Sequence, residues 1–238
     1  MILKKVSPLL VSLVLMLLFS SSAFAENSAL SNIEAAKLNV NPTVIYDEEE
    51  LKANFDELGI DEQTQKTLLE KLKGGEMLDS INPTKQHEGI TTKVSNQEIG
   101  LLAQPNSPFL YTRTVFPDGS VSIQSVTPGE GTICGSGYCN YQNAKVYYSN
   151  TVVTASFLAN FTIVNGGFSY ISDAWQPSVK TFISTSFSDL NLAITRPTET
   201  LQYSAQASMT WIFSSAAGST NQYLNLDVKD GVGKSTPN

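Results

Sequence analysis

The chain has 238 residues, and its 22 acidic and 15 basic side chains give a formal net charge of −7. This balance argues against nucleic acid as a partner, because binding to phosphates rewards clustered lysine and arginine. One histidine and two cysteines are too few ligands for a histidine- or cysteine-bound zinc site, so we expect no metal and no cofactor.

Residues 1–25 have the three parts of a cleavable export signal. Lys4 and Lys5 form a basic start, residues 9–19 form an apolar run, and Ala23 and Ala25 are small residues at alternate positions. The run is shorter than the roughly 20 apolar residues that a helix needs to cross a bilayer. We therefore predict cleavage between Ala25 and Glu26, and a secreted, extracellular protein with no stable membrane anchor.

Charge divides the processed chain into two regions. Without Lys4 and Lys5 the chain keeps 13 basic and 22 acidic side chains, a formal charge of −9. Residues 26–90 hold fourteen acidic side chains against six lysines, whereas residues 91–238 hold eight acidic against seven basic ones. The two regions should therefore differ in structure.

Residues 26–45 are polar without a sustained period, which predicts a flexible lead, and a helical hairpin is predicted over residues 46–79. Leu51, Phe55 and Leu58 recur at helical spacing in the first helix, and Gly59 ends it. Asp61 can cap a second helix, whose stripe consists of Leu68, Leu69 and Leu72. Such short helices are marginal alone, so the stripe needs a partner, either the downstream domain or another protein.

Polar residues with Pro83 and Pro105 predict a linker over residues 80–107. A β-domain is predicted over residues 108–230, with a first hairpin around the turn at residues 117–119. Apolar and polar side chains then alternate over residues 153–163 and 201–213, as in half-buried strands. Seven to nine such strands without crossover helices predict a mainly β fold, an antiparallel β-sandwich or small barrel. We expect this domain to fold without the helices, and residues 231–238 to form a flexible tail.

Cys134 and Cys139 enclose the spacer Gly-Ser-Gly-Tyr. In an oxidising extracellular setting such a pair favours a disulfide, with free thiols as the alternative. A bridge across so short a loop would hold a hairpin end and add little to global stability.

No catalytic constellation is visible, and we predict no enzyme. His87 lies in the predicted linker, without the packed and oriented partner that a catalytic base needs. The tail Gly231 to Thr236 has the end of a phosphate-binding motif but lacks its first glycine and its following helix. Carboxylates of the β-region fall in predicted turns and indicate no pair; they are Glu98, Asp118, Glu130, Asp173, Asp189, Glu199, Asp227 and Asp230.

Aromatic residues near the predicted hairpin ends are the remaining candidates for function: Tyr138, Tyr141, Tyr147, Tyr148, Phe168, Tyr170 and Trp175. We select Tyr147, Tyr148, Tyr170 and Trp175 as candidate binding residues, because exposed rings stack on sugars or anchor protein contacts. The alternative explanation is that these rings close the ends of the sandwich.

Several short motifs resemble a family of exported proteins of Gram-positive bacteria that is known only as a domain of unknown function. The motifs are Gly59-Ile60, Leu68-Leu69, Lys71-Leu72, Gly75-Glu76, Asp79-Ser80, Asn82-Pro83, Phe116 to Ser120, Ala155 to Phe157 and Phe161 to Gly167. The resemblance covers most of the processed chain. It implies an extracellular β-domain and supplies no catalytic residues.

The sequence is compatible with three classes of function. The first is a secreted, non-enzymatic β-domain that binds cell-wall glycan or an extracellular protein. The second is a bacteriocin-like or pore-forming toxin, because serine- and threonine-rich hairpins such as Val179 to Ile194 could line a membrane barrel. The third is a carbohydrate-active enzyme that uses two carboxylates. The sequence leaves the oligomeric state open.

Overall fold

The structure is a computed structural model that describes residues 47–95, 110–183, 186–215, 218–229 and 232–237. All of these residues belong to one compact unit, Pro42–Asn238. The predicted export signal with its cleavage site, the flexible lead, and linker residues 96–107 lie outside the described residues.

The two predicted helices are confirmed as α2 (Glu48–Glu57) and α3 (Glu62–Lys73). Asp47 caps α2 and Asp61 caps α3, each by accepting two backbone N–H donors of the first turn. Gly59, with φ of +65°, ends the first helix in the left-handed conformation that glycine adopts without strain. The predicted cap at Asp61 and the predicted end of the first helix at Gly59 are confirmed, and Asp47 is a further cap.

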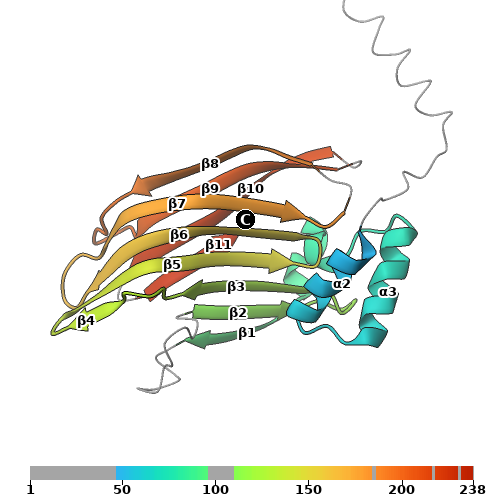
Figure 1. Cartoon of the computed structure of the whole chain (residues 1–238), viewed down its shortest axis with the longest axis horizontal. Helices are drawn as coiled ribbons and strands as arrows, with labels where there is room; N and C mark the ends of the chain where they lie inside the picture. The colour runs from blue at the N-terminus through green and yellow to red at the C-terminus, as the bar shows by residue number, and fades with distance from the viewer. Residues whose placement is uncertain (1–46, 96–109, 184–185, 216–217, 230–231, 238) are drawn as a thin grey trace, which may run out of the picture. The chain divides into compact units, whose positions relative to one another are not determined.

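Eleven strands of the described chain form two antiparallel sheets (Figure 1). The first sheet has the order β1 (Ile90–Ser95), β2 (Leu110–Val115), β3 (Val121–Thr127), β5 (Tyr138–Asn150), β6 (Val153–Val164) and β7 (Tyr170–Thr181), with β4 (Ile133–Gly135) paired only to β5. The second has the order β11 (Val232–Pro237), β10 (Gly218–Lys229), β9 (Ala205–Ser215) and β8 (Ser186–Arg196). The predicted mainly β, antiparallel sandwich is confirmed.

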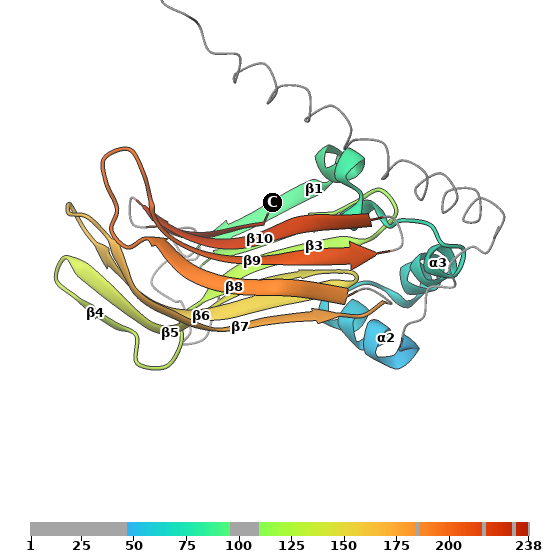
Figure 2. The same ribbon diagram turned by 90° about the horizontal axis from the view of Figure 1, so that it is seen from above.

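Alternation along the strands builds the core between the sheets. The odd-numbered side chains of β6 from Val153 to Phe161 are buried, as are those of β9 from Ala205 to Trp211. β10 lies over β5 and β6, and β11 over β3 and β5 (Figure 2). Each large side chain in this layer stabilises the fold by about 1.5–3 kcal/mol through removal from water.

The helical hairpin packs on the end of the sandwich where β5 passes into β6. Leu51 and Phe55 are fully buried and belong to the same apolar cluster as the sheets. The amide of Asn54 donates to the carbonyl oxygens of Asn150 and Thr151, both at 3.0 Å. The partner of the helical stripe is thus the β-domain. The helices and the sheets share one core, and the folding of the β-domain without the helices stays a prediction.

Two segments predicted to lack structure contribute strands or turns. The first part of the predicted linker forms the short 3₁₀ helices η2 (Asp79–Ile81) and η3 (Pro83–Glu88) and then strand β1. The predicted tail forms β11, paired with β10. Both strands are short and lie at sheet edges, where polar sequences with weak alternation are tolerated and therefore escape prediction.

Two predicted strands also have different bounds. β9 starts at Ala205, so Leu201 and Tyr203 precede it in a loop instead of entering the core. The segment Val179 to Ile194, predicted as one hairpin, is divided between the two sheets, because β7 belongs to the first and β8 to the second. This passage from sheet to sheet is set by tertiary packing, which alternation alone does not encode.

β-bulges bend three of the long strands. The register of β5, β7 and β8 shifts at positions where Asn143, Gln176 and Asp189 adopt positive φ. β7 and β8 are edge strands that lie side by side, and a single bridge joins Tyr170 to Thr198. The extra residue in a bulge increases the local twist of the strand.

A polar network fixes the turn between β2 and β3 to the helical region. Oδ1 of Asp118 accepts hydrogen bonds from the backbone and hydroxyl of Ser120, and Oδ2 accepts from the backbone N–H of Asp79 and from Lys71. Burial raises the pKa of Asp118, but these hydrogen bonds outweigh it and hold the pKa below its ordinary value.

Replacing Asn54 by alanine should lower the free energy of unfolding by about 2–4 kcal/mol, because two buried carbonyl groups lose their donor. Urea denaturation measures the change, with the exposed Asn191→Ala as the control. An unchanged midpoint in the Asn54 variant would contradict the proposed importance of this contact.

Replacing Asp118 by asparagine should lower stability at pH 7 by about 1–3 kcal/mol. A carboxylate with a lowered folded pKa stabilises the fold above its unfolded pKa of about 3.9, and this contribution is lost as pH falls through the folded value. The difference between wild type and variant should therefore shrink below about pH 4. Denaturation at pH 7, 5, 4 and 3 tests this, with the exposed Asp173→Asn as the control. A difference that stays constant over this range would refute the assignment.

Candidate functional site

Exposed apolar side chains gather at the end of the sandwich opposite the helices. β5 begins at this end with Tyr138 and finishes beside α2 with Asn150 (Figure 1). We call residues 133–139, 164–170 and 197–204 the apolar tip. Six of the nine large exposed hydrophobic side chains among the described residues belong to it: Ile133, Tyr138, Phe168, Tyr170, Leu201 and Tyr203.

Hydrogen bonds join the three loops of the apolar tip to one another. The backbone N–H of Asn165 donates to the carbonyl oxygen of Gly137 at 2.8 Å, which links the first loop to the second. Ser169 and Glu199 link the second loop to the third. The backbone N–H of Ser169 donates to the Glu199 carboxylate at 3.0 Å, and the backbone N–H of Glu199 donates to the Ser169 carbonyl oxygen at 2.8 Å. The second loop is therefore bonded to both of the others.

The third loop is also closed on itself. The backbone N–H of Thr200 donates to the carbonyl oxygen of Tyr203 at 2.8 Å, and the N–H of Tyr203 donates to the Thr200 hydroxyl. Arg196 donates to the carbonyl oxygen of Ser204 at 2.7 Å and lies over the Tyr203 ring. These contacts hold Leu201 and Tyr203 outward without a regular strand.

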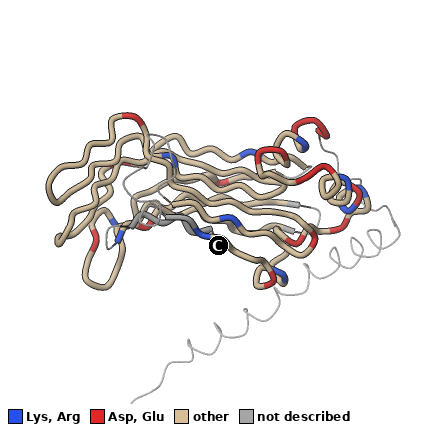
Figure 3. Tube along the Cα trace, turned by 90° about the horizontal axis from the view of Figure 1, so that it is seen from below, with Lys and Arg blue, Asp and Glu red and all other residues tan. Residues whose placement is uncertain are grey.

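The apolar tip carries no exposed charge. Its three segments contain a single ionisable acid, Glu199, whose side chain is buried and bonded to Ser169. Figure 3 shows that acidic and basic residues crowd the helical end and are sparse at the opposite end. The two ends of the sandwich thus differ sharply in polarity.

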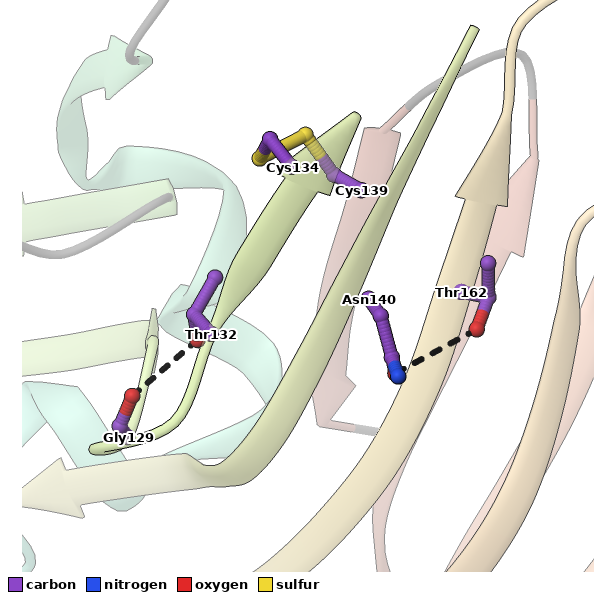
Figure 4. The surroundings of a disulfide bond; sticks show 6 residues. All are labelled: Gly129, Thr132, Cys134, Cys139, Asn140 and Thr162. Carbon is purple, nitrogen blue, oxygen red and sulfur yellow. Dashed lines mark hydrogen bonds between the residues drawn. A yellow bond between two sulfur atoms is a disulfide. The ribbon is translucent and has the colours of Figure 1, made fainter. Parts of the chain in front are cut away.

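A disulfide closes the hairpin of the first loop, as predicted. Cys134 and Cys139 are directly opposed in the β4–β5 pair, with a sulfur–sulfur distance of 2.09 Å (Figure 4). The Tyr138 ring lies close to the backbone of Gly135, where an added Cβ would be 2.7 Å from the ring. The bridge and this close approach fix the position of Tyr138 on the apolar tip.

The four aromatic residues selected from sequence do not form one site. Tyr147 and Tyr170 pair with Ser156 and Thr162 of β6, which places them six residues, roughly 20 Å, apart along the sheet. Only Tyr170 belongs to the apolar tip.

The other three candidates lie elsewhere on the first sheet. Tyr148 packs against the core, and its hydroxyl accepts a hydrogen bond from Asn150. Trp175 is half-buried on β7 opposite Leu158.

Tyr147 lines a hollow of about 270 Å³ at the foot of α2. Its hydroxyl donates to Glu57 at 3.1 Å, and the Lys145 ammonium lies 4.7 Å from the centre of its ring. Burial, with Glu57 as a further contributor, raises the pKa of Tyr147 to about 12. Tyr147 thus joins the helix to the sheet instead of presenting a free ring.

The remaining sequence candidates give no assembled centre. Asp118 serves the turn network, and His87 is exposed in η3. No three residues of His, Cys, Asp or Glu lie together among the described residues, which leave out Glu98 and Asp230. Nor is any helix of the described ranges long and apolar enough to span a bilayer.

Sequence reasoning missed most of the apolar tip. Leu201 and Tyr203 continue the alternation of β9, so the pattern assigned them to the core. Ile133 is a single apolar residue beside a glycine-rich turn, and Tyr138 and Phe168 belong to the hairpin-end aromatics that were not selected. The apolar tip could have been found only by considering the three turn segments together. Each has large apolar residues, and the three contain only one charged residue.

Replacing both Cys134 and Cys139 by serine should lower the free energy of unfolding by no more than about 2 kcal/mol, because the closed loop is short. Residues 128–139 should become more sensitive to protease, because the hairpin end opens more often. Denaturation and limited proteolysis with mass spectrometry measure the two effects, with reduced wild type as the control. General unfolding of the variant would contradict a local role.

Comparison with known proteins assigns no family. No family model and no curated protein matches the chain. The crystal structure of a hypothetical protein, lmo2686, from Listeria monocytogenes EGD-e matches at 16% sequence identity and a TM-score of 0.34, covering 66% of this chain and 98% of that one. The match is with an uncharacterised protein of a Gram-positive bacterium, and the family resemblance of the sequence stays unconfirmed.

Proposed function

We propose that this protein is an exported, non-enzymatic binding protein that attaches to an extracellular surface through the apolar tip. The observation that carries the proposal is the gathering of six exposed apolar side chains, without exposed charge, on three loops, of which the second is hydrogen-bonded to the first and to the third. Contiguous exposed apolar groups are unfavourable in water and mark interaction sites.

The construction of the apolar tip also supports binding. Ordering a mobile loop on association costs free energy, and the cost falls when the loop is already held in place. The bonds between Asn165 and Gly137 and between Ser169 and Glu199, together with the Cys134–Cys139 bridge, hold all three loops. A disulfide and a predicted leader both suit an oxidising, extracellular setting.

The toxin hypothesis loses the feature that suggested it. Val179 to Ile194 was the predicted alternating hairpin, and its two strands belong to opposite sheets. The hypothesis of a carboxylate enzyme is left with one neighbouring pair of acids, Asp79 and Asp118. Each accepts the backbone N–H of the other in the turn network, and both side chains are buried. Surface binding is therefore the function that the geometry supports best.

The double variant Leu201→Ser/Tyr203→Ser should lose most of its retention on intact Gram-positive cells and on their total envelope fraction. The two side chains are exposed outside the core, so the fold should persist while apolar contact is lost. Sedimentation of chains 26–238 with cells, followed by quantification of the pellet, measures retention.

Ile90→Ser is the matched control, because Ile90 is 78% exposed, against 86% for Leu201, and lies outside the apolar tip. The control should be retained like wild type. If the double variant is retained as well as this control, the apolar tip is not the attachment site and the proposal fails.

A further inference from the structure

We infer that the surface contacted by the apolar tip is the interfacial zone of a zwitterionic lipid bilayer, which the loop ends enter to a shallow depth. This inference rests on the proposed function and names its partner. It departs from the glycan or protein partner expected from sequence, and four properties of the apolar tip support it.

The first property is the presence of aliphatic side chains among the exposed groups. Tyrosine and phenylalanine suit several partners, because their rings stack on sugars and also concentrate at membrane interfaces. Leu201, which is 86% exposed, and Ile133 have no stacking face to offer a sugar. Hydrocarbon is the environment that accepts both kinds of side chain.

The second property is a protruding shape. Small ligands and sugars bind in concave sites that cover most of their surface. The hollow beside Tyr147 and another of about 460 Å³ between α2 and α3 both lie at the helical end. At the apolar tip the apolar groups stand instead on three separate loop ends. A fluid bilayer adapts to such projections, whereas a rigid partner would need a matching pocket for each.

The third property is the state of the backbone. Entry into an apolar medium is costly for any N–H or C=O group that lacks a partner. At the apolar tip, Thr200 bonds to Tyr203, Asn165 bonds to Gly137, and Lys229 donates to the carbonyl oxygen of Leu201 at 3.2 Å. These internal bonds lower the cost of moving the loops toward the acyl chains.

The fourth property is the distribution of charge. No exposed charge belongs to the apolar tip, and two cations beside it, Arg196 and Lys229, donate to its carbonyl oxygens. The chain as a whole is acidic. Binding should therefore depend on apolar contact, be insensitive to salt, and be no stronger on anionic lipid than on zwitterionic lipid.

Flotation of chains 26–238 with phosphatidylcholine vesicles tests the inference. Wild type and Ile90→Ser should float with the vesicles, and Leu201→Ser/Tyr203→Ser should partition at least about tenfold more weakly. Raising salt from roughly 0.1 to 0.5 M, or adding phosphatidylglycerol, should not strengthen binding. Circular dichroism of the double variant verifies that its strands are intact.

A tryptophan at position 168 reports the depth of entry. The fluorescence of Phe168→Trp should be quenched by vesicles that contain brominated phosphatidylcholine. Phe187→Trp is the matched control, since Phe187 is also exposed but lies outside the apolar tip, and it should show no added quenching. Equal quenching of the two would overturn shallow entry by the apolar tip.

The outcomes separate this inference from the proposed function. If wild type is retained on cells and the double variant is not, but wild type does not float with the vesicles, the lipid partner is overturned and the proposed function stands. The lipid partner is also overturned if wild type binds lipid-free wall glycan or envelope protein and the double variant does not. The partner is then that glycan or protein. Retention on cells that the double variant keeps would end both.

Discussion

The turn at Asn150 and Thr151 is the contact on which the arrangement of helices and sheets depends. Its carbonyl oxygens accept the Asn54 amide from α2, and the Thr151 hydroxyl bonds to Ser80 of η2 and lies 3.3 Å from the backbone nitrogen of Val121, which donates to it. Buried backbone groups need such partners, and here each partner comes from a different segment. The turn therefore locks the helices to one end of the sandwich and leaves the other end uncovered.

This fixed end gives the molecule its polarity. Acidic and basic groups concentrate on the helices and the nearby turns, where Lys71 and Lys180 pair with Asp118 and Glu50. At the far end charged residues are sparser, and rings, aliphatic groups and uncharged polar groups make up the exposed part of the apolar tip. Because most charged side chains lie at the helical end, a negatively charged partner that approaches the opposite end meets little long-range electrostatic repulsion. The charge difference between the two halves of the sequence, visible before any coordinates, is the source of this asymmetry.

Local physical rules were sufficient for much of the fold. The caps at Asp47 and Asp61 and the alternation around Phe157 and Met209 depend on neighbours in sequence, so helices and central strands could be predicted. Edge strands β1 and β11 could not, because one open side relaxes the requirement for alternating apolar residues.

The candidate site could not be predicted from neighbouring residues alone, for a different reason. The same apolar pattern places Met209 inside and Leu201 outside, and only the hydrogen bonds of the loop before β9 distinguish them. Local rules also give no sign that the Tyr147 hydroxyl bonds to Glu57 of α2 or that Tyr148 packs against the core, because these contacts depend on the tertiary structure. Tyr170 could be found because it is an aromatic residue close to the predicted turn at residues 165–167.

The bulges at Gln176 and Asp189 have a consequence for the protein at high concentration. They lie in β7 and β8, the adjoining margins of the two sheets, and break the regular spacing of each strand near its middle. An unbroken margin invites strand-by-strand growth into fibrils, because another molecule can continue its ladder. Here a second molecule would find only short stretches in register, so this flank of the sandwich is protected from polymerisation by its own backbone.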